Sequence, residues 1–174
     1  VTFMENRRAG FANYLDKFKA ESPQTSQSAA LGINANPFTL GHLHLIEKAA
    51  AENGHVHLFM VSDDSSLVPF PIRKKLIKAG TAHLKNITYH ETGPYIISQS
   101  TFPSYFQKDD QDVIRSQAEL DVTSFVQIAK TLGINKRYVG QEPPSMVTNL
   151  YNQIMSKKLP EMGIDCVLIP RLEV

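Results

Sequence analysis

The stretch at residues 29–51 reads AALGINANPFTLGHLHLIEKAAA, and the fold can be worked out from it. Ala29 to Ala35 is a short apolar run, which is typical of a buried strand. Leu40 to Ala51 places apolar side chains three and four residues apart, which indicates an amphipathic helix. A buried strand joined to a helix by a short turn is the opening half of a βαβ unit, so the stretch favours a parallel sheet.

Strands and helices continue to alternate along the rest of the chain. Further apolar runs predict strands at residues 55–62, 86–90, 137–140 and 164–169, and helical spacing predicts helices at 72–82, 119–132 and 145–157. The strands lack clean polar alternation, as expected for a parallel sheet that is covered on both faces. We therefore predict an α/β domain with a Rossmann-like, doubly wound, five-stranded parallel sheet.

Residues 94–118 interrupt this alternation. They are rich in Ser, Thr, Tyr, Phe and Gln, and their second half contains the acidic residues Asp109, Asp110 and Asp112. We interpret the segment as an insertion and the acidic cluster as a solvated loop, because long insertions in compact domains are often functional loops.

Length and composition limit the classes of protein that need to be considered. A chain of 174 residues is one domain, or one domain with a short appendage. Its net charge of +1 gives no reason to expect nucleic acid as a partner. The single cysteine, Cys166, cannot form an internal disulfide, which fits a reducing, cytoplasmic location. No apolar run is long enough to span a bilayer and no signal peptide is apparent, so we expect no membrane partner and no secretion.

Residues 1–28 precede the first predicted strand. Phe11, Leu15 and Phe18 fall at helical spacing, and residues 22–28 form a polar linker. The pattern fits the tail of an upstream domain with its linker, and equally a frayed N-terminal helix of this domain. We adopt the first interpretation: residues 1–28 are a helical leader and linker from an upstream domain, and residues 29–174 are the α/β domain.

The turn after the first predicted strand is the candidate functional site, because ligands of parallel α/β sheets bind at the carboxyl ends of the strands. Pro37 presets the turn, and Gly41 lets a backbone or a phosphate approach closely. Thr39 and His42 are three residues apart at the start of the helix, so their side chains share one face. Together with the N-terminal amides of the helix they form an anion site that suits a phosphorus centre gaining negative charge.

The segment Asn36-Pro37-Phe38-Thr39-Leu40-Gly41-His42 resembles the (His/Thr)-x-Gly-His signature of the nucleotidyltransferase superfamily, and its position between a strand and a helix strengthens the resemblance. Most adenylyltransferases of that group have a glycine nine residues before the histidine, where this chain has Ile33. With residues 95–106 and 137–144 included, the chain is similar to the C-terminal domain of the citrate lyase ligase family. Full-length members have an upstream acetyltransferase-like domain and a segment beyond the fifth strand that closes over the nucleotide. We therefore expect residues 29–174 to be a nucleotidyltransferase-like domain truncated at its C-terminal end.

The resemblance implies an acid–thiol ligase that uses ATP. Acetate would attack the α-phosphorus and release pyrophosphate, and the thiol of the citrate lyase acyl-carrier subunit would then take the acetyl group and release AMP. His42 and Thr39 would stabilise the α-phosphate during the first step. Mg²⁺ would neutralise the triphosphate, bound mainly by phosphate oxygens and water, and no metal site made of protein ligands is predicted.

Other contacts to the nucleotide are expected from two strand ends and one helix. The residues expected to bind it are Asn34, Ala35, Asn36, Phe38 and Gly41 in the turn, Arg73 on the second predicted helix, and Gly140 and Glu142 after the fourth strand. Asn36 fits equally well as a residue that bonds backbone in the turn, and Arg73 as part of a solvated basic face. Ser98 and Thr101, in the insertion, are candidates for binding acetate or the arm of the carrier.

Several other reactive side chains are predicted to be structural. His44 lies about 200° around the helix from His42 and should point elsewhere. His55 and His57 share one face of a strand, but no third residue has the spacing of a zinc ligand. Cys166 lies in an apolar strand and is expected to be a buried, unreactive thiol.

Two further functions remain open. One is an adenylyltransferase with a phosphorylated acceptor of the pantetheine-phosphate type, against which Ile33 and the 94–118 insertion argue. The other is a nucleotide-binding module without turnover.

Overall fold

Five parallel strands form one sheet in the computed structural model, which describes residues 7–23, 27–62, 66–93, 111–142 and 144–172. The strands are β1 (Ser28–Ile33), β2 (Val56–Met60), β3 (Ile87–Glu91), β4 (Ile134–Gly140) and β5 (Asp165–Ile169). Their order across the sheet is β3-β2-β1-β4-β5, so the chain winds first to one side of β1 and then to the other. The predicted doubly wound parallel sheet is confirmed, and its switch point lies between β1 and β4.

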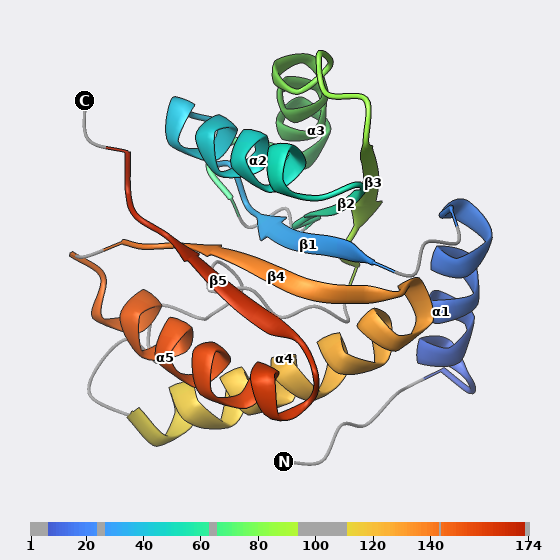
Figure 1. Ribbon diagram of the computed structural model, residues 1–174, viewed down its shortest axis with the longest axis vertical. Coiled ribbons are helices and arrows are strands. Elements are labelled where there is room, and N and C mark those ends of the chain that lie inside the picture. The colour runs from blue at the N-terminus through green and yellow to red at the C-terminus, as the bar shows by residue number, and fades with distance from the viewer. Residues whose placement is uncertain (1–6, 24–26, 63–65, 94–110, 143, 173–174) are drawn as a thin grey trace.

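Helices cover both faces of this sheet (Figure 1). They are α1 (Gly10–Glu21), α2 (Leu40–Glu52), α3 (Phe70–Gly80), α4 (Gln111–Leu132) and α5 (Met146–Glu161). Alternate residues of β1 enter two separate cores: Leu31 packs with Ile46 on the side of α2 and α3, and Ala30 packs with Val126 on the side of α1, α4 and α5. Burial of both faces of the central strands explains why the sequence shows apolar runs and not alternation.

Helix α1 packs onto this domain. Phe18 is 2% exposed and makes edge-on contacts with Phe59 and His90, with ring centroids 5.6 and 4.7 Å apart. The hydroxyl of Tyr14 donates to the carbonyl of Thr92, after β3, at 2.6 Å. The leader helix therefore contributes side chains to the core on the α4 side of the sheet. The assignment of residues 1–28 to an upstream domain stays a prediction.

Helix α4 begins earlier than predicted, which corrects the extent of the insertion. The sequence indicated a helix at residues 119–132, whereas α4 starts at Gln111. Its first turns add Ile114 and Ala118 to the buried stripe that continues through Val122, but the polar residues between them conceal this spacing. Asp112 lies in the first helical turn, where a carboxylate interacts favourably with the helix dipole, and so does not belong to a loop. Asp109 and Asp110 lie outside the described residues.

None of the helices in the described part of the chain is both long enough and apolar enough to cross a membrane.

Candidate active site

The turn from β1 to α2 is fixed by a reciprocal cap between Thr39 and His42. Thr39 is the N-cap of α2, and its Oγ1 accepts a hydrogen bond from the backbone N–H of His42 at 3.5 Å. In return, Nδ1 of His42 accepts the backbone N–H of Thr39 at 3.1 Å and lies 2.8 Å from Thr39 Oγ1. The two residues that the sequence pairs as a site are therefore in direct contact, and capping positions the imidazole at the start of the helix.

This cap determines where His42 carries its proton. Because Nδ1 accepts the Thr39 N–H, the neutral ring must be protonated at Nε2, which leaves Nε2–H available as a donor. Burial lowers the pKa of His42, and the carboxylate of Glu142 opposes this shift only partly. At neutral pH the residue is therefore an uncharged donor beside the N-terminal amides of α2.

A buried arginine holds the turn from behind. Arg73, on α3, is fully buried, and its Nη1 donates to the backbone carbonyl of Asn34 at 2.9 Å, to Asn34 Oδ1 at 3.0 Å and to the carbonyl of Val61 at 2.7 Å. Its Nε donates to the carbonyl of Val68 at 2.9 Å, and Asn36 Oδ1 accepts the N–H of Val68 at 2.9 Å. Arg73 and Asn36 thus join the β1–α2 turn to the segment that follows β2. The burial of Arg73 contradicts the alternative of a solvated basic face, whereas its contact with a phosphate stays a prediction. In this structure its guanidinium positions the loop.

The backbone at Ala35 adopts a left-handed conformation, with φ of 52°. A residue with a Cβ adopts this region rarely, at a cost of about 1–3 kcal/mol unless its surroundings hold it. The three hydrogen bonds that join Arg73 and Asn36 to the adjoining residues supply that support. The turn is therefore rigidly constrained next to the candidate site.

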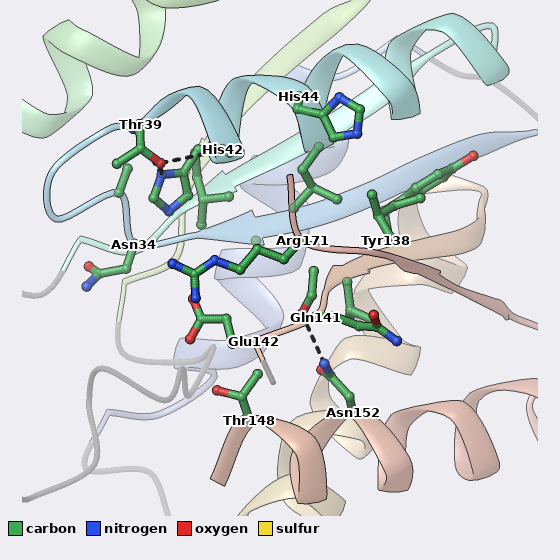
Figure 2. Close-up of a pocket in the computed structure, with 18 of the residues that line it drawn as sticks. Asn34, Thr39, His42, His44, Tyr138, Gln141, Glu142, Thr148, Asn152 and Arg171 are labelled. Atoms are coloured by element: carbon green, nitrogen blue, oxygen red, sulfur yellow. Dashed lines mark hydrogen bonds between the residues drawn. The ribbon is translucent and has the colours of Figure 1, made fainter. Parts of the chain in front are cut away.

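A cavity of about 530 Å³ opens beside this turn, at the carboxyl edge of the sheet. Figure 2 shows Thr39 and His42 on one side of it and Glu142, Thr148 and Asn152 on the other. The cavity brings together most of the predicted site residues: Asn34, Ala35, Asn36, Thr39, Gly41, His42, Gly140 and Glu142. They come from the ends of β1 and β4 and from the start of α2, because the sheet places these at one edge.

Phe38 and Arg73, predicted to contact a nucleotide, are not among the residues that line the cavity. The ring of Phe38 stacks on the far side of His42, with centroids 5.9 Å apart and planes 19° apart. It also packs against Gly80 at the end of α3, where an added Cβ would lie 2.5 Å from the ring. Phe38 therefore supports the imidazole of His42 from behind. Ser98 and Thr101, the acetate candidates, lie outside the described residues.

Sequence reasoning missed several residues of the cavity wall. His44 points away from the ring of His42, as expected, but it is also among the residues that line the cavity, further along α2 (Figure 2). Thr148 and Asn152 lie four residues apart on α5, and Asn152 Nδ2 donates to the carbonyl of Gly140 at 3.0 Å. Arg171, just after β5, also lines it. The only sequence feature that could have indicated these residues is their position, because each lies near the carboxyl end of a strand or in the first half of a helix that follows one.

The wall beneath β4 contains a buried ion pair. Oδ2 of Asp121 accepts the hydroxyl of Tyr151 at 2.5 Å and lies 3.5 Å from Nη2 of Arg137, whose guanidinium also lies 4.5 Å above the ring centroid of Phe125. Burial raises the pKa of Asp121, while Arg137 and the hydrogen bond from Tyr151 oppose that shift. Arg137 therefore has an ion-pair partner within the protein, while its Nη1 and Oδ1 of Asp121 are buried without a hydrogen-bond partner among the described residues.

His57 of β2 and His90 of β3 form a buried, stacked pair. Nδ1 of His57 lies 2.9 Å from Nε2 of His90, the rings stack, and both residues are almost completely buried. Burial, with repulsion from neighbouring histidines, lowers the pKa of His57 to about 3 and that of His90 to about 4. Within the described residues no group of three His, Cys, Asp or Glu side chains is arranged to hold a metal ion.

Solved structures with the same fold place the domain in a class. The chain matches a pantoate–β-alanine ligase from Francisella tularensis, solved with an ATP ligand and β-alanine, with a TM-score of 0.55 at 15% identity over 94% of this chain and 66% of that one. It matches a putative nicotinate-nucleotide adenylyltransferase from Vibrio parahaemolyticus with a TM-score of 0.51 at 19% identity, over 86% of this chain and 76% of that one. The protein is therefore an α/β domain of the nucleotidyltransferase-like fold.

The sequence defines the family more narrowly. Residues 28–174 match the family model of the citrate lyase ligase C-terminal domain, and the chain belongs to this family. A citrate (pro-3S)-lyase ligase of Escherichia coli (strain K12) is 37% identical over 175 residues, which cover all of this chain and 50% of that protein. The chain spans about half the length of the curated relatives it matches, between 50% and 53%. The family predicted from the sequence is confirmed.

Proposed function

We propose that the protein is the nucleotide-activating part of an ATP-dependent ligase that acetylates the thiol form of citrate lyase. The observation that carries this proposal is the Thr39–His42 cap at the N-terminus of α2, which directs a neutral imidazole donor and a set of backbone amides at one end of a cavity. Such an arrangement favours a phosphoryl group whose negative charge increases during reaction. The names of the curated relatives supply the acceptor, citrate lyase.

The chemistry consists of two displacements. An oxygen of acetate attacks the α-phosphorus of ATP, and the bond to the bridging oxygen breaks, so acetyl-adenylate forms and pyrophosphate leaves. The Nε2–H of His42 and the amides of α2 bind the α-phosphate oxygens as their charge increases. The thiol of the acyl-carrier subunit then attacks the acetyl carbonyl, the thioester forms, and AMP leaves after the thiol proton is lost to solvent.

Mg²⁺ fits the acidic side of this cavity. Glu142 lines the cavity, and its charge acts on His42, so a carboxylate lies within electrostatic reach of the proposed phosphate position. Mg²⁺ prefers oxygen ligands and retains several waters, so phosphate oxygens and Glu142, directly or through water, would hold it. The ion would supply charge neutralisation of the triphosphate. The remaining groups described here bind and orient the nucleotide.

The proposal is tested by exchange of labelled pyrophosphate into ATP, with Mg²⁺, in the presence and absence of acetate and without citrate lyase. Exchange that depends on acetate is the expected result, because it requires reversible formation of acetyl-adenylate. Exchange that depends instead on a phosphorylated acceptor such as phosphopantetheine would identify an adenylyltransferase and overturn the ligase proposal. ATP binding without exchange under any condition would leave a nucleotide-binding module.

A further inference from the structure

Among the described residues two arginines line the cavity, Arg137 and Arg171. They differ in burial and in whether a carboxylate lies close to the guanidinium. Arg137 is mostly buried, lies 3.5 Å from a carboxylate oxygen of Asp121 and stacks on Phe125. Arg171 is exposed, and none of the ion pairs between described residues involves it. Of the two cavity arginines, Arg171 is therefore the one without a carboxylate at ion-pair distance among the described residues, so its charge is available to a ligand.

The position of Arg171 is set by the ends of two strands. The N–H of Gln141, just after β4, donates to the carbonyl of Ile169 at the end of β5 at 2.9 Å. Pro170 follows with its restricted backbone, and Arg171 comes next. Figure 2 shows the guanidinium extending back across the cavity toward the end where His42 and Glu142 lie. The side chain thus faces the N-terminus of α2 from the opposite wall.

The charge balance of the cavity calls for such a group. The N-terminus of α2 supplies only a partial positive charge, about half an elementary charge. His42 is neutral, and Glu142 adds a carboxylate on the opposite side of the cavity. Mg²⁺ would neutralise only part of the charge of a triphosphate bound there, so without Arg171 an excess of negative charge would remain on the outer phosphates. A guanidinium matches two phosphate oxygens at once and keeps its charge at every accessible pH.

We propose that Arg171 binds the β- and γ-phosphates of the nucleotide and so positions pyrophosphate as the leaving group. The inference rests on the proposed function, because it assigns one residue to the same site. The α-phosphate lies at Thr39, His42 and the first amides of α2, and the outer phosphates extend toward the wall formed by the β5 end. Arg171 therefore distinguishes nucleoside triphosphates from monophosphates.

The test measures the dissociation constants of ATP, AMP and pyrophosphate, with Mg²⁺ and without acetate, by isothermal titration calorimetry. In Arg171→Gln the affinity for ATP and for pyrophosphate should fall about 10- to 100-fold, as expected for loss of a charge-assisted bidentate contact, while that for AMP stays within about twofold. Arg171→Lys should be intermediate, because the charge remains but the planar fork is lost. Arg115→Gln, which removes an exposed arginine from the surface of α4, is the matched control and should bind as the wild type does.

Equal weakening of ATP and AMP in Arg171→Gln, or wild-type affinity for ATP, would overturn the assignment of Arg171. The binding measurement on Arg171→Gln and the exchange assay on the wild type test different claims and can give opposite outcomes. Selective loss of ATP affinity in Arg171→Gln, with no acetate-dependent exchange in the wild type, would support Arg171 and contradict the ligase. Acetate-dependent exchange in the wild type, with unchanged ATP affinity in Arg171→Gln, would support the ligase and contradict the role of Arg171.

Discussion

The guanidinium of Arg73 holds Asn34 at two points, with Nη1 at 2.9 Å from the backbone carbonyl and 3.0 Å from Oδ1. The same nitrogen bonds the carbonyl of Val61, so a single buried cation joins the ends of β1 and β2. This explains how an arginine predicted to bind phosphate can matter for the site without facing it.

Arg73→Met should destabilise the protein strongly. Methionine fills much of the volume but leaves the carbonyls of Asn34, Val61 and Val68 without a donor, at a cost of about 3 kcal/mol or more. Urea denaturation should show a lower midpoint, and the KM for ATP in the exchange assay should rise because the turn loses its support. Arg115→Met, on the exposed surface of α4, should change stability by less than about 0.5 kcal/mol. A wild-type midpoint for Arg73→Met would contradict the positioning role.

His42→Ala should remove catalysis and leave the fold. Loss of a donor to the developing phosphate charge typically reduces the rate by about 10²–10³-fold.

Thr39→Ala should lower the free energy of unfolding by about 1 kcal/mol, because the helix cap is lost. It should also slow exchange, because the imidazole of His42 is no longer held, whereas Thr39→Ser should retain the stability and the exchange rate of the wild type. The readouts are exchange rate and denaturation midpoint. His83→Ala, which removes an exposed histidine of the surface pair with Glu47, serves as the control. Full exchange in a folded His42→Ala protein would refute the proposed role.

Gly80 should tolerate no side chain, because a side chain there would displace Phe38, the ring that stacks on His42. An added Cβ would lie 2.5 Å from the ring of Phe38, which stacks on the imidazole. Gly80→Ala should therefore displace Phe38, lower stability by about 1–3 kcal/mol and slow exchange. Gly54→Ala is the matched control, because nothing lies within 4 Å of its added Cβ. Restoration of stability by Phe38→Leu in the Gly80→Ala background would confirm the contact, and equal behaviour of the two alanine variants would contradict it.

Mild acid should weaken the fold through the His57–His90 pair. The pKa values of about 3 and about 4 lie below the unfolded value near 6.5, so the unfolded chain binds protons first as the pH falls. The stability contributed by these neutral rings is complete above about pH 6.5 and is lost progressively toward the folded pKa values. The free energy of unfolding should drop by up to about 4 kcal/mol between pH 7 and pH 5, about 2 kcal/mol for each histidine.

The double variant His57→Phe/His90→Phe should flatten this dependence, because it keeps two stacked rings and removes both titrations. Denaturation curves at pH 5, 6 and 7 give the comparison, and His83→Phe, on the surface, should keep the wild-type slope. An unchanged slope in the double variant would show that other groups cause the acid sensitivity.

The sheet and the start of the site could be predicted because their signals are local. An apolar run, a turn and a capped helix follow one another between residues 29 and 51, and each is encoded by its own residues. Glu142 could be placed in the site from the sequence because parallel strands end at one edge.

The features that could not be predicted from the sequence depend on tertiary packing. The spacing of Phe11, Leu15 and Phe18 fits any amphipathic helix, and only the aromatic contacts of Phe18 show what it packs against. Burial of Arg73 depends on where three backbone carbonyls meet. The approach of Arg171 and His44 to the cavity depends on how α2 and the end of β5 face each other, and no sequence period encodes that.

The aromatic contacts of α1 have a practical consequence for where this protein can be cut. The family match begins at residue 28, whereas the side chains packed into the core include Phe18 of α1, a helix that starts at Gly10. A shorter version that starts at Ser28 would expose Phe59 and His90, each of which is 2% exposed in the intact protein. Their rings would form an apolar, aggregation-prone patch on the sheet. Proteolysis should accordingly spare α1 in the native state, and soluble expression should require it.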